Sequence, residues 1–402
     1  MRIEHLSLKN FRNYTRLEAS FPEGNILLHG QNAQGKTSLL EAIYYLATST
    51  SPYTTSDRQL INWRTEDEPL PFAQISAEIL ATDRTINRLS ITLVREEANS
   101  PGERFKKEIR LNGVSRRRMD ILGVVAVVMF LPQDLILVEG APSNRRRYMD
   151  STLNQIDGAY SEALNTFEKV LVQRNALLKQ IGRGRSAVEE LEYWDEQLTE
   201  TAAIIIAGRQ RFLREIENEA AQIYRDLTGN KEDLKLSYVP SFEPTAEGDG
   251  QLSFAIPGLD LHRQLTPDQI APQYMESLAQ SRREEVDRGM TLSGPQRDEL
   301  RFYVNNRDLG LYGSRGQART AVLAIKLAEL AWMREKIGEY PLLLLDEVAS
   351  ELDEYRRGYL LEQIQDASQA VLTTTDPTIF PNSFLDAATV WEVNAGQIEE
   401  VA

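Results

Sequence analysis

The sequence contains no cysteine and only three histidines among its 402 residues. Without cysteine there is no disulfide framework and no thiolate metal site, and so few histidines argue against a histidine-based metal centre or histidine-driven catalysis. No apolar run reaches the length needed to span a bilayer, and charged residues interrupt the first segment at once. We therefore expect a soluble, cytoplasmic protein with no membrane partner.

Positive charge is also scarce, since the 45 lysines and arginines are outnumbered by 60 aspartates and glutamates, which gives a net charge of −15. This balance argues against a protein that coats nucleic acid through bulk charge. It leaves room for a local basic face, although each basic cluster taken alone fits a solvated surface better. The clusters are Lys106-Lys107, Arg116-Arg117-Arg118, Arg145-Arg146-Arg147 and Arg282-Arg283.

A loop near the N-terminus carries the strongest chemical signal in the chain. It fits the phosphate-binding pattern G-x-x-x-x-G-K-[ST] at every fixed position, between an apolar run and a segment with apolar residues at helical spacing. Glycines let the backbone wrap a phosphate chain, and amides at a helix N-terminus point toward the anion. The lysine would neutralise the β- and γ-phosphates, and the threonine would bind Mg²⁺. The loop predicts a nucleoside triphosphate site formed by Gly30, Gln31, Asn32, Ala33, Gln34, Gly35, Lys36 and Thr37.

Apolar patterns divide the remainder of the chain into sheet-forming and helical parts. Alternation at 74–80 and 89–93, with an Asn112-Gly113 turn, predicts a mainly antiparallel sheet after the P-loop helix. The run at 124–130 predicts a buried strand. From Ser143, a candidate helix cap, the pattern is helical as far as about residue 227.

A break at 182–184 divides this helical part into two long antiparallel helices. A stretch rich in proline and glycine at 240–267 predicts a loop-rich connection, and a further helix is expected at 267–288. Strands at 300–304 and 369–374, with a helix at 320–332 between them, indicate the second half of the nucleotide-binding domain.

An apolar run that ends in two carboxylates forms a second element of the site. The run at 342–345 predicts a buried strand followed by Asp346 and Glu347, as in a Walker B element. A carboxylate at the end of this strand can bind Mg²⁺ directly or through water, so we expect Asp346 and Thr37 to hold the metal. Glu347 is then placed to orient or deprotonate the attacking water. We expect Lys36, Asp346 and Glu347 to be the catalytic residues.

The segment before the predicted helix at 320–332 resembles the signature of ABC-type ATPases, usually written LSGGQ. It keeps the serine, the second glycine and the glutamine as Ser314, Gly316 and Gln317, whereas Arg315 replaces the first glycine. A serine hydroxyl and glycine amides at a helix N-terminus form a second anion-binding device. In this fold class the signature closes on the nucleotide held by a second subunit.

Two further positions follow the ABC pattern only in part. Residues 350–353 stand where these ATPases have their D-loop. The strand expected at 369–374 is followed by Thr375 and Asp376 rather than by the switch histidine of transport ATPases. Thr375 and Asp376 are therefore the candidates for sensing the γ-phosphate.

The order of the motifs resembles that of the Rad50 and SMC heads, with the P-loop first, a helical insertion, and the signature and Walker B last. More specifically, the chain resembles the RecF family of bacterial DNA-repair ATPases, because the insertion is too short for the long coiled coils of Rad50 or SMC. One motif departs from the family pattern GPHRD, with Gln296 in place of the histidine. The stretches that carry the resemblance are 8–14, the P-loop, 142–150, 294–300, 312–320 and 343–353.

The resemblance implies an α/β fold: a P-loop ABC-type ATPase head, built on a mixed sheet with a flanking antiparallel sheet, plus a helical arm lobe. We expect residues 1–135 and 291–402 to form the head and residues 136–290 the arm. The resemblance also implies that Arg12 and Asn13 reach the nucleotide. Gln133 lies near the expected Q-loop and is a further candidate metal ligand.

In function, the resemblance implies an ATP-operated DNA clamp with ATP and Mg²⁺ as cofactors. Members of the family form an ATP-dependent homodimer on DNA, hydrolyse ATP slowly, and help to load recombinase at gaps with RecR. We expect single- and double-stranded DNA to be bound without sequence preference, through phosphate contacts that depend strongly on salt. The candidate contacts are Arg145, Arg146, Arg147, Lys106 and Lys107, with Arg116 to Arg118 as further candidates.

Three other functions compete with the clamp. A helicase-like DNA motor shares the P-loop, but further helicase motifs are missing and the signature favours an ABC-type head. A transport ATPase subunit would carry the switch histidine. A head that serves a nuclease would need a metal-binding nuclease domain, for which this length leaves no room. DNA-stimulated ATPase activity without strand separation would favour the clamp over the motor.

Overall fold

The computed structural model describes residues 1–402 except 66–67, 82, 97–103, 243–264 and 402. The chain forms two compact units, Met1–Asp134 with Glu329–Ala402, and Leu135–Ala328. The first boundary lies one residue from the expected 135/136. The second differs from the expected 290/291, because residues 291–328 include a strand that pairs within the second unit.

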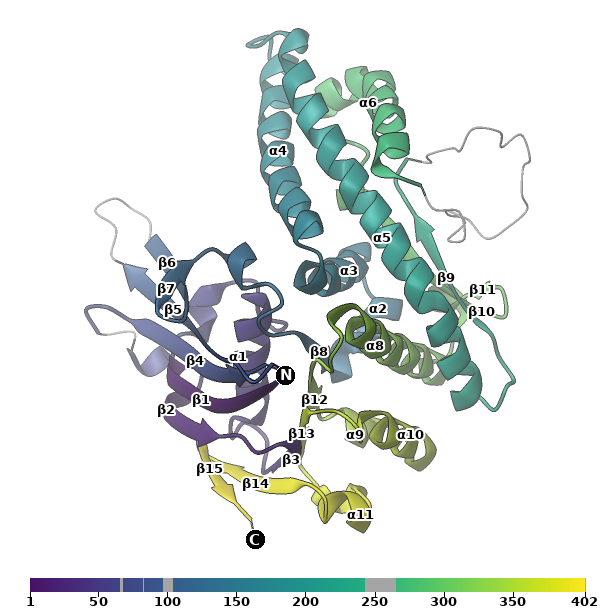
Figure 1. The fold of residues 1–402 in the computed structure, drawn as a ribbon. Coiled ribbons are helices and arrows are strands. Elements are labelled where there is room, and N and C mark those ends of the chain that lie inside the picture. The colour runs from purple at the N-terminus through teal and green to yellow at the C-terminus, as the bar shows by residue number, and fades with distance from the viewer. Residues whose placement is uncertain (66–67, 82, 97–103, 243–264, 402) are drawn as a thin grey trace. The chain divides into compact units, whose positions relative to one another are not determined.

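The first unit contains a six-stranded mixed sheet in the order β15-β14-β3-β13-β12-β8 (Figure 1). Its central strands are parallel, so their carboxyl ends meet at one edge, and only β15 runs antiparallel to its neighbour. Buried apolar runs of the sequence form the strands β8 and β12 and, with β3 and β13, make up the inner part of the sheet, as expected where both faces are covered. The strands are β3 (Gly24–His29), β8 (Val127–Phe130), β12 (Leu342–Asp346), β13 (Gln369–Thr374), β14 (Thr389–Asn394) and β15 (Gln397–Glu400).

A second six-stranded sheet in the same unit is antiparallel throughout, in the order β2-β1-β4-β5-β6-β7. Helix α1 (Lys36–Thr48) contacts strands of both sheets, and its Leu39 and Ile43 belong to the one apolar core that they share. This confirms the predicted head with its flanking antiparallel sheet. The strands are β1 (Arg2–Phe11), β2 (Tyr14–Ser20), β4 (Phe72–Leu80), β5 (Ile86–Glu96), β6 (Arg104–Leu111) and β7 (Val114–Arg116).

Short helices complete the first unit. The 3₁₀ segments η1 (Asp57–Leu60) and η2 (Trp63–Thr65) follow α1, η3 (Arg118–Ile121) follows β7, and η4 (Pro132–Leu135) follows β8. The helices and the turn that follow β12 and β13 are α9 (Val348–Glu351), α10 (Glu354–Ile364), η7 (Pro377–Ile379) and α11 (Asn382–Leu385).

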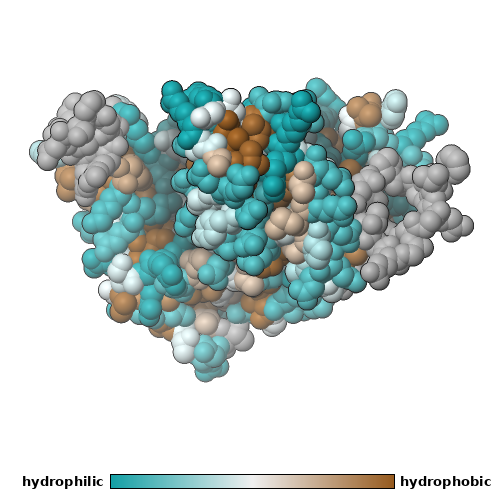
Figure 2. Space-filling model, turned by 90° about the horizontal axis from the view of Figure 1, so that it is seen from above, coloured by the Kyte–Doolittle hydropathy of each residue, from teal (hydrophilic) through white to brown (hydrophobic). Residues whose placement is uncertain are grey.

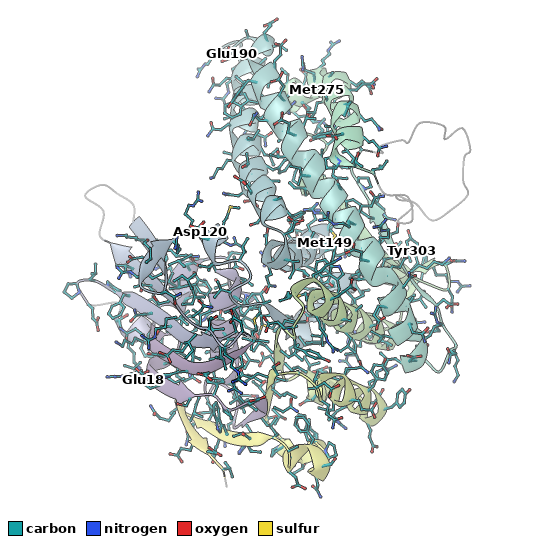
Figure 3. All side chains as sticks on the ribbon, viewed as in Figure 1. Glu18, Asp120, Met149, Glu190, Met275 and Tyr303 are labelled. Carbon is teal, nitrogen blue, oxygen red and sulfur yellow. The ribbon has the colours of Figure 1, made fainter. Side chains whose placement is uncertain are left out.

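The second unit is a helical lobe with a small sheet. Helices α4 (Gly158–Gly182) and α5 (Leu191–Leu227) form the predicted long hairpin, and α6 (Pro267–Arg288) packs against both (Figure 1). Glu190 lies at the tip of this hairpin, and Met149, in α3 (Pro142–Ile156), lies near its base (Figure 3). The remaining elements are α2 (Ile136–Glu139), η5 (Val188–Glu190), η6 (Pro295–Arg297), α7 (Leu309–Tyr312) and a sheet of β9 (Leu234–Val239), β10 (Glu299–Val304) and β11 (Arg307–Asp308). Helix α8 (Arg315–Ile337) begins in this unit, and its residues from Glu329 onward belong to the first unit.

Two local expectations about the helical lobe are corrected. Ser143 does not cap α3, because Ala141 is the N-cap residue and Pro142 occupies the first helical position. The helix that carries the arginine triplet also ends earlier than expected, at Ile156, where Asp157 accepts a hydrogen bond from the amide of Tyr160 at 3.0 Å and starts α4. An aspartate cap between two apolar-faced helices is an easily missed signal, because the helical spacing continues across it.

The arm hairpin is joined to α6 by buried charges. The guanidinium of Arg174 is fully buried and pairs with Asp195 and Glu285, each at 2.7 Å, and donates to Thr291 at 2.8 Å. Burial lowers the pKa of Arg174, but the two carboxylates outweigh it and raise the pKa above its ordinary value. These contacts tie α4, α5 and α6 together.

The visible surface in Figure 2 is mostly hydrophilic, and its hydrophobic residues form small separate groups. Among the described helices, none combines the length and the apolar character needed to cross a membrane.

Candidate functional site

The predicted phosphate-binding loop connects β3 to α1, and its glycines are required by close neighbours. Gly30 and Gly35 have φ values of 149° and 122°. A Cβ at Gly30 would lie 2.4 Å from the carbonyl oxygen of Val393, and one at Gly35 would lie 2.8 Å from Asn13 Nδ2 and 2.9 Å from the Tyr14 hydroxyl oxygen. Side chains at these two positions would displace the loop from the strands that support it.

Hydrogen bonds from neighbouring segments hold the loop in place. Asn13 Nδ2 donates to the carbonyl of Gln34 at 3.1 Å, and the Tyr14 hydroxyl donates to the carbonyl of Gly35 at 3.0 Å. From the other side, the amide of Ala395 donates to Gln34 Oε1 at 2.7 Å. Asn13 was expected to reach the nucleotide, whereas no role was predicted for Tyr14, although it lies in the 8–14 stretch.

Lys36 lies across the mouth of the loop and is only 4% exposed. Its Nζ donates to the carbonyls of Gly30 at 2.6 Å and Gln31 at 3.2 Å, and it pairs with Glu347 Oε1 at 3.3 Å. The structure thus brings Lys36 and Glu347, which are far apart in sequence, into direct contact. A cation held in this way at a helix N-terminus is arranged to bind an anion.

Asp346 ends β12 beside the start of α1. The Thr37 hydroxyl donates to its two carboxylate oxygens at 2.9 and 3.0 Å, and the Thr373 hydroxyl donates to Oδ1 at 2.8 Å. Tyr53, which sequence analysis missed, donates to Oδ2 at 2.7 Å. Burial and the Asp346 charge raise the pKa of Tyr53 well above its ordinary value, so its hydroxyl stays a donor.

Glu347 has a left-handed backbone conformation, with φ of 53°. Its amide donates to the Thr373 hydroxyl at 2.9 Å, and Oε2 accepts from the amide of Thr375 at 3.2 Å. Thr375 therefore lies beside the Glu347 carboxylate, where a residue that senses the γ-phosphate is expected to lie. Asp376 instead caps η7 by accepting from the hydroxyl of Thr378 at 2.6 Å and from its amide at 2.9 Å, and these two bonds lower the pKa of Asp376.

A pocket of about 850 Å³ opens over the loop. Arg12 and Asn13 line it together with residues 32–38 and Glu347, and a separate wall is contributed by residues between Ser56 and Trp63. Arg12 is fixed by a two-point ion pair with Glu41, with both N–O distances 2.7 Å, and by a bond to the carbonyl of Gln59 at 3.0 Å.

Gln133 lies in η4, which directly follows β8. Because β8 pairs in parallel with β12, with Phe130 opposite Leu345, Gln133 and Asp346 follow neighbouring strand ends at the same sheet edge. The described residues contain no group of three or more His, Cys, Asp or Glu side chains suited to a metal. A Mg²⁺ site here would therefore depend on one carboxylate, a hydroxyl and the phosphates, which is the usual arrangement for this ion.

The signature-like segment begins α8 in the second unit. The Ser314 hydroxyl accepts from the amide of Gln317 at 3.2 Å, and Gln317 Oε1 accepts from the amide of Ser314 at 2.9 Å, which is a capping box. Gln317 Nε2 also donates to Glu232 at 2.7 Å. The chain itself gives no steric reason for Gly316, since an added Cβ would meet only the Ser314 hydroxyl oxygen at 3.9 Å.

The arginine triplet does not act as one cluster, and the expected DNA contact by Arg145 is corrected. Arg145 is 8% exposed and forms a two-point ion pair with Glu299 at 2.6 and 2.8 Å. Arg146 is partly buried, which lowers its pKa, and it donates to the carbonyl of Asp298 at 2.8 Å. Only Arg147 is exposed.

The other basic candidates lie on the antiparallel sheet of the first unit. Lys106 and Lys107 are both exposed, and Lys107 also pairs with Asp57 at 2.8 Å and donates to the carbonyl of Ser49, also at 2.8 Å. Arg116, Arg117 and Arg118 are exposed at the end of the sheet and just beyond it.

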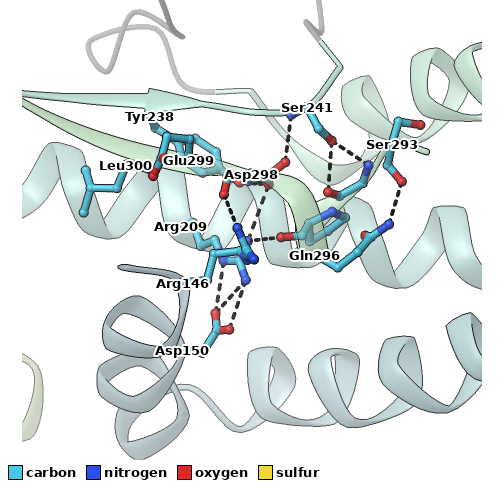
Figure 4. A network of polar contacts seen from close by, with 12 residues as sticks. Arg146, Asp150, Arg209, Tyr238, Ser241, Ser293, Gln296, Asp298, Glu299 and Leu300 are labelled. Atoms are coloured by element: carbon cyan, nitrogen blue, oxygen red, sulfur yellow. Dashed lines mark hydrogen bonds and ion pairs between the residues drawn. The ribbon is translucent and has the colours of Figure 1, made fainter. Parts of the chain in front are cut away.

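Two sequence motifs meet in a buried polar network in the second unit (Figure 4). Arg209 of α5 donates to both carboxylate oxygens of Asp150 at 2.9 and 3.0 Å and pairs with Asp298 at 3.4 Å. Asp298 also accepts from Tyr238, and burial raises its pKa above the ordinary value for aspartate. Gln296, where the family pattern has histidine, donates to the carbonyl of Ser293 at 2.9 Å. The network joins the 142–150 and 294–300 motifs and explains them structurally.

The P-loop, the Walker B strand and the mixed sheet with its antiparallel partner define an ABC-type P-loop head. The chain belongs to the RecF family, within the group described as "RecF/RecN/SMC N terminal domain", whose profile matches residues 2–396. It is 39% identical over 409 residues to a protein of Chloroflexus aggregans named DNA replication and repair protein RecF, with 99% of each chain covered. A protein of the same name from Halalkalibacterium halodurans is 38% identical over 402 residues, with 100% of each chain covered.

Solved structures agree with this assignment. The chain matches a structure described as the recombination mediator protein RecF with ATPrS in the RecFOR pathway, with a TM-score of 0.83, 28% identity, and coverage of 100% of this chain and 98% of the other. The corresponding RecF–ATP structure matches equally well, with a TM-score of 0.83. An SMC head bound to the C-terminal winged helix domain of ScpA, 15% identical with a TM-score of 0.51, shares the fold.

Proposed function

We propose that this chain is an ATP-dependent DNA clamp in recombinational repair. ATP binding closes two heads into a dimer on DNA, and slow hydrolysis releases it, so that the clamp assists recombinase loading at gaps together with RecR. The observation that carries the proposal is the presence of two separate anion-binding devices, the loop around Lys36 in one unit and the capped helix start at Ser314 in the other. The RecF–ATP structure of the RecFOR pathway is a full-length relative in support.

The residues around the loop fit ATP with Mg²⁺. The pocket of about 850 Å³ accommodates a nucleotide, and Lys36 supplies positive charge beside backbone amides. The Thr37 hydroxyl and the Asp346 carboxylate, 2.9 Å apart, offer the two protein oxygens that a phosphate-bound Mg²⁺ uses in P-loop proteins. When bound, Mg²⁺ neutralises charge on the β- and γ-phosphates.

Glu347 supplies the base of the hydrolysis reaction. Its carboxylate is fixed by the Thr375 amide and by Lys36, which aims it into the pocket that it lines. A carboxylate held there orients a water molecule and accepts its proton as the water attacks the γ-phosphate. Because the rest of the site is organised around Asp346, the two carboxylates have distinct roles, one for the metal and one for water.

The helix start at Ser314 is the surface that receives a second subunit's nucleotide. A glycine with no internal steric role, such as Gly316, fits a position that another molecule approaches closely. The contact between the γ-phosphate and the second subunit's helix start exists only in the dimer. A ligand-driven switch requires such a difference in contacts between its two states.

We assign DNA binding to those candidate basic residues that are exposed. These are Arg147 in the helical lobe and Lys106, Lys107, Arg116, Arg117 and Arg118 in or just beyond the antiparallel sheet. With a net charge of −15, the chain offers few such contacts, so we expect modest DNA affinity in the absence of ATP. Contacts of this type position the nucleic acid without reading its sequence.

Sedimentation velocity of wild type, Lys36→Ala and Ser314→Arg, with and without ATP and Mg²⁺, tests the proposal. We expect wild type to dimerise only with ATP and both variants to stay monomeric. A wild type that never changes its state would refute the clamp and favour a monomeric P-loop translocase. A Ser314→Arg variant that dimerises normally would show that Ser314 acts only as a helix cap.

A further inference from the structure

The pocket over the loop is lined by two chemically different sets of residues. Lys36, Thr37 and Glu347 provide cationic, hydroxyl and carboxylate groups in the first set. A second wall comes from the segment that contains η1 and η2, between Ser56 and Trp63. The first set suits a triphosphate, so the second wall remains for the nucleoside.

This second wall is firmly attached to the β1–β2 turn. The amide of Arg12 donates to the carbonyl of Leu60, and the amide of Asn62 donates to the carbonyl of Asn10, both at 2.8 Å. The Arg12 guanidinium adds a bond to the carbonyl of Gln59 at 3.0 Å. A wall bonded in this way is preorganised, so little ordering is needed when a ligand binds.

Trp63 is the one aromatic side chain among the described residues that line the pocket. It is 67% exposed, although an indole is one of the largest apolar groups that a protein can bury. The exposure is imposed by its neighbours: Asn62 is buried, its Oδ1 accepts from the amide of Arg64 at 2.9 Å, and its carbonyl accepts from the amide of Thr65 at 3.0 Å. The turn therefore presents the indole at the pocket instead of in the core.

Arg64 lies against the indole. Its guanidinium carbon is 5.4 Å from the centre of the Trp63 ring, within cation–π range. This contact restrains the ring, and most of the remaining ring surface is exposed.

We infer that Trp63 stacks on the base of the nucleoside triphosphate, as a positioning and affinity residue for the nucleotide bound at Lys36. The inference rests on nucleotide binding as part of the proposed function, but not on dimerisation or DNA binding. Stacking of a base on an aromatic ring contributes about 1–3 kcal/mol by alanine substitution, or about 5- to 150-fold in affinity. Every base has a π-face, so the contact accepts any nucleobase.

Binding titrations of the full-length protein with ATP and with ribose 5′-triphosphate, which lacks the base, test the inference. For Trp63→Ala we expect ATP affinity to fall about 5- to 150-fold while ribose 5′-triphosphate affinity stays at the wild-type level. Trp63→Phe should keep most of the ATP affinity. Tyr193→Ala is the matched control, because Tyr193 is 61% exposed on the arm hairpin, and it should change neither ligand.

Fluorescence supplies a second readout. The difference in emission between wild type and Trp63→Phe isolates one of the four tryptophans, and ATP but not ribose 5′-triphosphate should quench it. Unchanged ATP affinity in Trp63→Ala, equal weakening of both ligands, or saturation by ATP without quenching would each overturn the stacking. A wild type that binds ATP through Trp63 but never dimerises would refute the clamp and leave the stacking intact.

Discussion

The Thr37 hydroxyl donates to the Asp346 carboxylate at 2.9 Å across 309 positions of sequence. The bond joins the first turn of α1 to the end of β12, and so it links the two nucleotide motifs directly. Asp346 is 5% exposed, and Thr373 and Tyr53 also donate to it, so the carboxylate is held in one orientation. A rigid pair of oxygen ligands favours Mg²⁺, which demands near-ideal geometry.

Removing the Thr37 hydroxyl should weaken the metal site. We expect Thr37→Val to lower the Mg²⁺ affinity of the ATP-bound protein at least about tenfold, because a ligand oxygen is lost while the side-chain volume is kept. Thr37→Ser retains the hydroxyl and is the control. The measurement is ATP binding as a function of Mg²⁺ concentration, and identical Mg²⁺ dependence in Thr37→Val and Thr37→Ser would contradict the assignment.

Neutralising Glu347 should separate binding from hydrolysis. We expect Glu347→Gln to reduce the ATPase rate about 10²- to 10⁴-fold, since general-base catalysis contributes this much, while ATP still binds. Steady-state phosphate release and equilibrium ATP binding provide the two readouts. Glu354→Gln, at an exposed glutamate at the start of α10, is the control. Normal turnover in Glu347→Gln would assign the base to another residue.

The signature can be tested without removing its helix cap. Aspartate and asparagine are both good N-cap residues, so Ser314→Asp and Ser314→Asn each preserve the start of α8. Only aspartate adds a negative charge where the partner's phosphates are proposed to bind. We expect Ser314→Asn to dimerise with ATP and Ser314→Asp to remain monomeric in sedimentation. Equal behaviour of the two variants would argue against a phosphate contact at Ser314.

The exposed member of the arginine triplet should contribute to DNA binding through charge alone. We expect Arg147→Ala to make the plot of log affinity against log salt less steep by about 0.9 for duplex DNA, the value for one lost phosphate contact. Arg16→Ala, whose arginine is 71% exposed on β2, should leave the slope unchanged. An Arg147→Ala slope equal to that of wild type would remove Arg147 from the interface.

Breaking the buried charge cluster of the arm should cost far more than breaking a surface pair. Arg174→Met leaves Asp195 and Glu285 buried together, and we expect a loss of about 3–5 kcal/mol in the free energy of unfolding. Arg288→Met, which removes an exposed pair with Glu284 on α6, should cost about 0–1 kcal/mol. Urea unfolding of the full-length chain measures both. A similarly small loss in the free energy of unfolding for both variants would show that water solvates the buried carboxylates once Arg174 is removed.

Local patterns predicted the elements that we propose to bind phosphate because their chemistry is local. The loop from Gly30 to Thr37 has its glycines, lysine and threonine within one short segment. The strand that ends at Asp346 is likewise a short apolar run followed directly by carboxylates. Helix α6 and strand β13 were predicted with the bounds that the structure has, since Pro267, Gly289 and apolar runs mark them. The start of α4 at Asp157 was missed, since helical spacing alone does not reveal a cap between two adjoining helices.

Charge patterns could not be interpreted in the same way, because burial depends on the whole fold. Arg145, Arg146 and Arg147 are identical in sequence, but helical rotation places the first against Glu299 and leaves the third exposed. Tyr53, which supports Asp346, belongs to no motif, and Tyr14 lies in the 8–14 stretch but its bond to Gly35 was not predicted. Trp63 lines the pocket from a turn that a bond between the Arg64 amide and Asn62 Oδ1 helps to fix.

The sequence by itself determined the kind of chemistry, the order of the elements and the family. Only the tertiary structure decided which charged groups are available, because the pairing of Arg145, the burial of Arg174 and the meeting of Thr37 with Asp346 all arise between segments distant in the chain. Local propensities act within a few residues, whereas desolvation and ion pairing depend on neighbours that folding alone brings together.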